Sequence, residues 1–185
     1  MRIISGTFGS RQLKGTPPPG IRPTSDKLRE TLFNILGGRV SGSAFLDGFA
    51  GTGAIGIEAI SRGAASVTFV ESSRRAVSII RKHISTLDVR EGYRILEMEF
   101  AKACRTLENE AATFDIAFLD PPYDREELYT SALEKFGSMP LLCEGGILVI
   151  EHSKRREFAE SAGMLEKYRT RTQGDSSLSF YRKRS

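Results

Sequence analysis

One stretch decides the fold of this chain: residues 44–56, which read AFLDGFAGTGAIG. The apolar residues at its start predict a short buried strand, and Asp47 stands at the end of that strand. A loop of small residues follows, and the apolar positions after it recur with helical spacing as far as Arg62-Gly63. A strand, a glycine-rich loop and a helix in this order let a ligand approach bare backbone at a helix N-terminus.

A second strand is predicted over residues 66–70, one βα unit further along the chain, and it ends at Glu71. A carboxylate in that position can accept hydrogen bonds from both hydroxyls of a ribose. Two neighbouring strand ends would therefore carry a glycine loop and a ribose-binding acid. This combination predicts a site for a nucleoside cofactor.

The glycine spacing alone leaves the cofactor open between two classes. Gly51-x-Gly53-x-x-Gly56, with Glu71 twenty residues beyond Gly51, also fits the dinucleotide fingerprint. Asp47 favours a different ligand, because a carboxylate beside the loop repels a pyrophosphate and attracts a cation. The sulfonium and α-ammonium groups of S-adenosylmethionine are such cations. We therefore predict S-adenosylmethionine rather than NAD, since a glycine turn without a ligand would leave both acids unexplained.

Apolar runs and helical patterns alternate along the chain as far as residue 162. A first helix is expected between an N-cap at Thr24 or Ser25 and a stop at Gly37-Gly38. Further helices are predicted over 72–87, 101–110, 125–136 and 153–162, and strands over 93–97, 114–119, 145–150, 165–172 and 177–182, the last two joined by the turn 174–176. This order predicts an α/β fold with a doubly wound, mostly parallel, seven-stranded sheet. A small N-terminal hairpin precedes it, and an antiparallel hairpin ends it.

Length and composition bound the remaining possibilities. We expect a single domain over residues 1–185, with a basic hairpin and linker in 1–21 and the catalytic core in 22–185. No apolar run is long enough to span a membrane, and the first residues are too polar for a signal peptide. Two cysteines and two histidines, widely spaced, predict neither a disulfide framework nor a metal site. We therefore expect a cytoplasmic monomer without a bound metal.

The net charge of +4 is unevenly distributed along the chain. Residues 1–29 and residues 153–185 each carry +5, which leaves −6 for residues 30–152. Basic ends on an acidic body indicate that the ends hold a polyanion such as RNA, although charge also serves solubility. The candidate RNA contacts near the N-terminus are Arg2, Arg11, Lys14, Arg22 and Arg29, of which Arg22 and Arg29 could instead cover the cofactor pocket.

A second motif that can carry chemistry is Asp120-Pro121-Pro122-Tyr123, which follows the predicted apolar strand 114–119. The prolines fix φ and remove two N–H donors, so that the bend presents carbonyl oxygens and one carboxylate. Acceptors at Asp120 and at the Pro121 carbonyl can hold both hydrogens of an exocyclic amine and turn its lone pair toward an electrophile. Tyr123 offers a face on which the base can stack. Positioning supplies most of such a reaction, because a sulfonium methyl group is already electrophilic.

These motifs carry a resemblance to known families. Asp47-x-Phe49-x-Gly51-x-Gly53 together with Asp120-Pro-Pro-Tyr123 resembles class I (Rossmann-like) S-adenosylmethionine-dependent amino-methyltransferases. More narrowly, Arg22-Pro-Thr-Ser-Asp26 and Arg29-Glu-Thr-Leu-Phe-Asn34 before the glycine loop resemble the bacterial RsmD family. Enzymes of that family methylate N2 of a guanine in small-subunit (16S) ribosomal RNA. The resemblance covers nearly the whole chain.

The resemblance implies roles by position. Asp47 and the loop Gly51–Gly53, with Phe49 among the cofactor residues, would hold the methionine end, and Glu71 the ribose. The family usually reads the adenine amine with Asp or Asn, and the corresponding cofactor-binding position of this chain is Phe100, beside Glu99. Either Glu99 takes over that contact or Phe100 only packs. The implied catalytic set is Asp120, Pro121, Pro122 and Tyr123.

Other functions compete with this one. An amino-methyltransferase acting on adenine or cytosine in DNA or another RNA stays open, because the Asp-Pro-Pro-Tyr motif is shared among those enzymes. A C5-pyrimidine methyltransferase needs a cysteine nucleophile, and neither Cys104 nor Cys143 follows a strand of the predicted sheet edge. An NAD oxidoreductase would lack a proton donor, and an RNA-binding module would not explain the double proline.

The form of the substrate can also be predicted. The chain has no sizeable inserted target-recognition domain. We therefore expect it to recognise shape in an assembled or assembling small ribosomal subunit rather than a sequence in free RNA.

Overall fold

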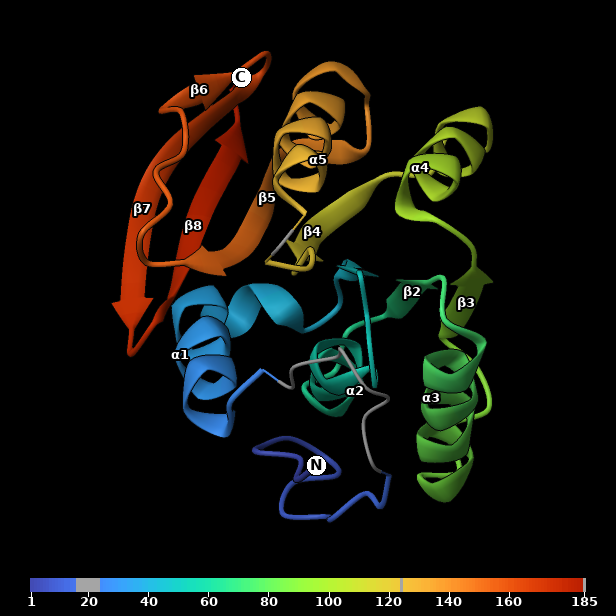
Figure 1. The fold of residues 1–185 in the computed structure, drawn as a ribbon. Helices are drawn as coiled ribbons and strands as arrows, with labels where there is room; N and C mark the ends of the chain where they lie inside the picture. The colour runs from blue at the N-terminus through green and yellow to red at the C-terminus, as the bar shows by residue number, and fades with distance from the viewer. Residues whose placement is uncertain (16–23, 124, 185) are drawn as a thin grey trace.

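An eight-stranded sheet divides the protein into two layers of helices (Figure 1). The structure is a computed structural model that describes residues 1–15, 24–123 and 125–184. The strands are β1 Ala44–Gly48, β2 Ser66–Glu71, β3 Tyr93–Glu97, β4 Phe114–Leu119, β5 Leu142–Ser153, β6 Ser161–Ala162, β7 Leu165–Gln173 and β8 Ser176–Lys183. The helices are α1 Asp26–Leu36, the 3₁₀ turn η1 Gly37–Val40, α2 Ala54–Ser61, α3 Arg74–Thr86, α4 Phe100–Asn109 and α5 Glu126–Ser138.

The strand order is β3-β2-β1-β4-β5-β8-β7-β6. The first five strands of this order pair in parallel, and β8 pairs antiparallel with both β5 and β7. The doubly wound, mostly parallel sheet with a C-terminal antiparallel hairpin is thus confirmed. The count differs by one strand, because the two-residue β6 pairs with the outer edge of β7.

Helices cover both faces of the sheet, with α1, α2 and α3 on one face and α4 and α5 on the other (Figure 1). Neighbouring residues of the central strands alternate between the two cores: Phe45 and Val149 lie in the α1–α3 core, and Leu46 and Ile150 in the α4–α5 core. Burial on both faces explains why these strands read as continuous apolar runs in the sequence.

The first helix begins and ends as the sequence predicts. The Ser25 side chain caps α1 by accepting a hydrogen bond from the Leu28 N–H. Gly37 ends the helix with a φ of 55°, a conformation that costs glycine little. The predicted linker 16–20 and the candidate contact Arg22 lie outside the described residues.

The prediction of a helix over residues 153–162 is wrong. Strand β5 continues to Ser153, and an irregular segment then leads to β6. The Phe158 carbonyl accepts from the Lys167 ammonium at 2.8 Å, and the Glu160 carbonyl accepts from the Lys167 N–H at 2.7 Å. The Phe158 carbonyl, which a helix over these residues would use internally, is therefore committed to β7.

The N-terminal segment, residues 1–15, lies against α2 on the α1–α3 face (Figure 1). The expected hairpin is reduced to a single antiparallel bridge between Arg2 and Gln12. The Ile3 and Leu13 side chains are buried in the core beside it. The segment is therefore part of the packed fold.

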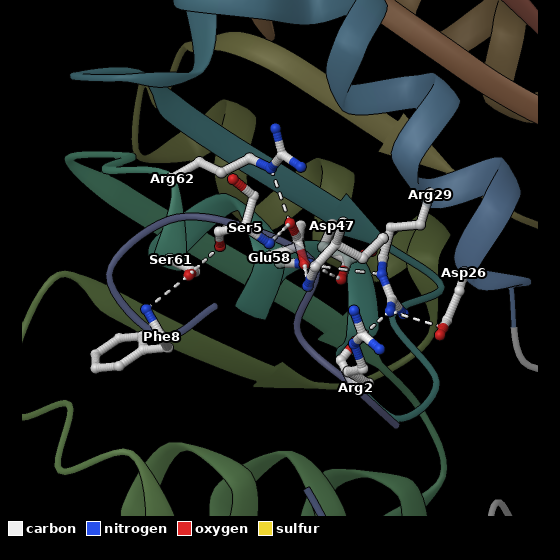
Figure 2. A network of polar contacts seen from close by, with 11 residues as sticks. Arg2, Ser5, Phe8, Asp26, Arg29, Asp47, Glu58, Ser61 and Arg62 are labelled. Carbon is white, nitrogen blue, oxygen red and sulfur yellow. Dashed lines mark hydrogen bonds and ion pairs between the residues drawn. The ribbon is translucent and has the colours of Figure 1, made fainter. Parts of the chain in front are cut away.

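One buried carboxylate, Glu58 of α2, fastens this segment (Figure 2). It accepts hydrogen bonds from the N–H groups of Ile4 at 2.8 Å and Ser5 at 3.0 Å. The Arg62 guanidinium donates to it at 2.8 Å from the next turn of α2. Ser61 extends the attachment, since its hydroxyl accepts from the Phe8 N–H and donates to the Ser5 carbonyl.

Arg29 completes the network from α1 and is only 1% exposed (Figure 2). Its guanidinium donates to the Arg2 carbonyl and to Asp26, and its Nε lies 3.8 Å from a carboxylate oxygen of Glu58. Burial lowers the pKa of Arg29, while the charges of Asp26 and Glu58 act in the opposite direction. Arg29 thus joins α1 to the N-terminal segment, which corrects the expectation that it contacts RNA.

We expect Glu58→Gln to destabilise the protein by about 3 kcal/mol, because it leaves the buried Arg29 without its buried counter-charge. Urea unfolding measures this loss, and faster proteolysis within residues 1–15 should accompany it. Glu30→Gln, on the exposed face of α1, is the matched control. Equal stability of the two variants would show that the network does not hold the segment.

Candidate functional site

The loop between β1 and α2 has a tightly constrained backbone. Gly51 and Gly53 adopt positive φ values of 54° and 77°, and Phe49, which is not a glycine, adopts 61°. Positive φ at an aromatic residue is a strained state that persists only where the surroundings enforce it. A Cβ atom at Gly48 would lie 2.4 Å from the Leu119 side chain. The Leu119 side chain, packed closely against Gly48, therefore helps to hold the start of the loop in one conformation.

Glu71 lies directly against this loop. One carboxylate oxygen accepts the Gly51 N–H at 2.8 Å, and the other accepts the Ser73 N–H at 2.7 Å. The structure thus brings together the glycine loop and the acid that the sequence places on separate strands. A carboxylate has about four acceptor positions, so Glu71 keeps capacity for the two hydroxyls of a ribose.

Asp47 is 1% exposed and lies inside the turn. It accepts a hydrogen bond from the Gly56 N–H at 2.8 Å, which ties the end of β1 to the first turn of α2. The pKa of Asp47 is raised to about 8, chiefly by burial and with a smaller contribution from the nearby charge of Glu71. Its carboxyl group therefore lies behind the loop surface and supports the loop shape.

Phe100, the first residue of α4, is 6% exposed. Its ring stacks on Phe49 at 4.6 Å between centroids and lies 6.4 Å from Phe136. The sequence leaves open whether Phe100 only packs or whether Glu99 takes over the adenine contact. In the structure the Phe100 side chain packs against these aromatic rings. Glu99, exposed at the N-cap of the same helix, is the polar side chain beside it.

The Asp120-Pro121-Pro122-Tyr123 motif leaves the sheet beside the glycine loop. The Asp120 N–H donates to the Gly48 carbonyl at 3.4 Å, continuing the pairing of β4 with β1. The buried Tyr129 hydroxyl of α5 donates to the Pro121 carbonyl at 2.7 Å. A carbonyl oxygen has two lone pairs, so one remains for another donor.

Tyr123 is half-buried, and its hydroxyl is held by two side chains. It donates to Glu151 of β5 at 3.3 Å and lies 2.9 Å from the Ser176 hydroxyl of β8. The Thr24 hydroxyl donates to the second oxygen of Glu151 at 3.4 Å. Burial raises the pKa of Tyr123 to about 12, so the phenol stays neutral at physiological pH. These contacts fix the direction of the ring.

Glu151 and Ser176 are the site residues that the sequence reasoning missed. A usable signal existed for Glu151, because it is an acid near the carboxyl end of a buried strand, as Asp47, Glu71 and Asp120 are. The sequence predicts a strand that ends at residue 150, so Glu151 stands directly after it, as Glu71 and Asp120 do after their predicted strands. Ser176 reaches the site only through the pairing of β8 with β5, which no local pattern indicates.

Neither cysteine belongs to this edge of the sheet. Cys104 is buried in α4, and burial raises its pKa to about 12. Cys143 lies at the amino end of β5, where its thiol donates to Asp115. Within residues 1–15, 24–123 and 125–184, no cluster of three or more metal-binding side chains is found, and no helix is long and apolar enough to cross a membrane.

The remaining N-terminal candidates lie on the surface. Arg2, Arg11 and Lys14 are exposed, and the Arg11 guanidinium lies 5.3 Å from the centre of the Phe8 ring. The attachment of residues 1–15 to α2 thus holds these charges in place.

The chain is similar to known proteins over its whole length. A family model described as Conserved hypothetical protein 95 matches residues 1–182. The chain is 34% identical to Bacillus subtilis YlbH over 184 residues, which cover 100% of both proteins. It is 38% identical over 125 residues to the Escherichia coli protein named Ribosomal RNA small subunit methyltransferase D, covering 68% of this chain and 61% of that protein. The solved structure of Escherichia coli yhhF matches with a TM-score of 0.85 at 29% identity, over 100% of this chain and 98% of that chain.

The raised pKa of Asp47 makes a prediction about stability. The folded protein keeps a proton on Asp47 up to about pH 8, whereas the unfolded chain releases it near pH 4. Stability should therefore fall as the pH rises through that window. Asp47→Asn should remove roughly 1–3 kcal/mol of the decrease between pH 5 and 8, measured by urea unfolding. Asp88→Asn, at an exposed position, is the control, and identical pH slopes in all three proteins would contradict the assignment.

Proposed function

Because the chain belongs to the RsmD family, whose model spans residues 1–182, we propose that it methylates small-subunit ribosomal RNA. The methyl donor is S-adenosylmethionine, and the acceptor is the exocyclic N2 amine of a guanine. The fold is that of class I methyltransferases. One observation carries the proposal: the Asp120 N–H donates to the Gly48 carbonyl. The glycine loop after β1 and the Asp120–Tyr123 motif after β4 therefore begin side by side at one edge of the sheet.

The residues at the loop fit the proposed cofactor. Gly51 and Gly53 keep a backbone without side chains where a ligand would approach, and Glu71 stands 2.8 Å from that backbone. In the proposal the loop holds the methionine end, with Asp47 and Phe49 supporting it from behind, and Glu71 binds the ribose. Phe100 packs beneath Phe49. When bound, S-adenosylmethionine supplies an electrophilic methyl group on a sulfonium.

The acceptor side works by positioning. The Asp120 carboxylate and the free lone pair of the Pro121 carbonyl accept the two hydrogens of the amine and direct its lone pair toward the loop. The second proline, Pro122, keeps the bend free of a competing N–H. Tyr123, with its hydroxyl held by Glu151 and Ser176, offers its ring to the base. The amine nitrogen would gain the methyl group as the bond from that methyl group to the sulfonium sulfur broke and left a neutral thioether, and the surplus proton of the amine would pass to Asp120 or to water.

The proposed partner is ribosomal RNA within an assembled or assembling small subunit, met by a monomer in the cytoplasm. Arg2, Arg11 and Lys14 support this, because the network around Glu58 holds their segment rigidly against α2. Arg22, outside the described residues, stays a proposed contact on its sequence position alone. A single methyltransferase domain, without an inserted recognition domain, suits a substrate recognised by its shape.

We expect Asp120→Ala to lower kcat for methyl transfer to ribosomal RNA by about 100-fold or more, because the amine loses its directing acceptor. Transfer of labelled methyl from S-adenosylmethionine measures the rate, and mass spectrometry of the RNA maps the base. Binding of S-adenosylmethionine and of RNA should remain, as should the activity of the control Asp88→Asn. Unchanged transfer by Asp120→Ala would overturn the proposal, and methylation mapped to adenine or cytosine would correct the acceptor.

The form of the substrate gives a separate prediction. Assembled small subunits should be methylated at least about tenfold faster than the same RNA free of protein, because shape recognition needs the folded particle. The comparison uses one enzyme preparation and equal RNA concentrations. Equal rates on the two substrates would remove the requirement for assembly and leave the reaction itself intact.

A further inference from the structure

The outer part of the α1–α3 face carries cationic side chains around one exposed aromatic ring. We define the β7 patch as Arg39, Tyr168, Arg169, Arg171 and Arg182, all of which are exposed. Tyr168 is 42% exposed, one of three large hydrophobic side chains so exposed among the described residues. None of the five belongs to the site at the ends of β1, β2 and β4, so their function needs its own explanation.

The register of the C-terminal strands puts these side chains on one face. Arg169 pairs with Phe180 and Arg171 with Leu178, and directly opposed residues of antiparallel strands point the same way. Phe180 and Leu178 are buried in the core beneath α1. The Arg169 and Arg171 side chains therefore emerge on the α1–α3 face, just beyond the part that α1 covers.

An irregularity in β7 adds the aromatic ring to the same face. The register shifts between Lys167 and Arg169, which leaves Tyr168 as an extra residue of the kind found in a β-bulge. A bulge can turn a side chain that regular alternation would send to the opposite face. The Tyr168 ring lies 6.1 Å from the Phe180 ring, which fixes it beside the arginines.

Positive charge in the β7 patch is largely uncompensated. Arg39, Arg169 and Arg182 all lie close enough to act electrostatically on the Tyr168 phenol. Arg182 is 3.5 Å from Glu166, whereas within the described parts of the chain Arg39, Arg169 and Arg171 have no carboxylate at ion-pair distance. On the opposite face, two basic side chains are paired, Lys167 with Glu160 at 2.6 Å and Arg156 with Glu126 at 2.9 Å.

We propose that the β7 patch binds the phosphate backbone of small-subunit ribosomal RNA and that Tyr168 stacks on an unpaired base. The inference rests on the proposed function for the identity of the RNA. Arginines without carboxylate partners around an accessible ring match what RNA offers, namely phosphates and the faces of unstacked bases.

The position of the β7 patch fits a footprint shared with the N-terminal segment. That segment and the patch lie on the same face of the sheet, and α1 separates them (Figure 1). RNA lying across α1 could contact Arg2, Arg11 and Lys14 at one side and the β7 patch at the other. The patch would then determine the affinity for RNA and the orientation of the bound RNA, and the chemical step would take place at the sheet edge that carries Asp120.

The test uses the full-length protein with Arg169→Gln and Arg171→Gln combined, and separately with Tyr168→Ala. Affinity for a small-subunit rRNA transcript and for assembled small subunits is measured between about 50 and 200 mM salt, a range that resolves phosphate contacts. We expect the double variant to bind about tenfold more weakly, and its salt slope to fall by about one for each phosphate that it no longer neutralises. Tyr168→Ala should weaken binding roughly fivefold with its salt slope unchanged.

Controls separate charge loss from misfolding. Arg169→Lys with Arg171→Lys keeps the charge and should keep the salt slope, and Arg90→Gln with Arg105→Gln removes two exposed arginines elsewhere. In methyl transfer the patch variants should raise KM for RNA and leave kcat at saturating RNA unchanged. A thermal unfolding midpoint equal to that of the parent protein confirms that the substituted surface is still folded.

Three outcomes decide the inference. Unchanged affinity and salt slope for both RNA forms in the patch variants would overturn it. Weaker binding to assembled subunits alone, with binding to the free transcript unchanged, would also overturn it, in favour of a ribosomal protein as the partner. If the parent protein binds RNA through the patch but methylates neither form, the proposed function fails while the binding surface stands.

Discussion

The parallel register of β1 with its two neighbours is the constraint on which the candidate site depends. Gly48 pairs with Val70 on one side and with Leu119 on the other. The residues that follow these partners, Glu71 at the end of β2 and Asp120 directly after β4, therefore lie at the same level as the glycine loop. Two hydrogen bonds reflect this arrangement. Glu71 accepts from the Gly51 N–H, and the Asp120 N–H donates to the Gly48 carbonyl. A shift of one residue in either pairing would separate the loop from one of its two acids.

Much of this arrangement could be predicted from the sequence, because strands buried on both faces are apolar throughout and end at polar residues. That rule places Asp47, Glu71 and Asp120 at one edge from the sequence alone. It fails where the backbone departs from regular patterns. Residues 153–162 have helical spacing, yet their carbonyls are used by Lys167 of β7, a partner that only the folded hairpin supplies.

Side-chain environments were harder to predict than strand ends. Arg29 has the appearance of a surface cation near a helix start, and nothing local indicates that Glu58 will be buried beside it. The sequence predicts that Asp47 offers its charge to a ligand, and nothing local indicates that its carboxyl group also accepts the Gly56 N–H. In both cases the deciding partner belongs to α2. Two buried carboxyl groups thus fix this helix: Asp47 ties its first turn to β1, and Glu58 ties its middle to the N-terminal segment.

Folding brings the two basic ends of the chain onto one face of the protein. The two basic ends are separated by more than 120 residues of acidic chain, and the sequence cannot say whether they meet. In the fold, residues 1–15 pack on α2, and the β7–β8 hairpin extends the same sheet beyond α1. The bulge at Tyr168 then turns the outer strand so that its arginines share the face of the N-terminal cations rather than alternating away from it. Since like charges repel, gathering them on one face costs stability unless a polyanion compensates for it, and this cost is the physical reason to connect the basic face with RNA.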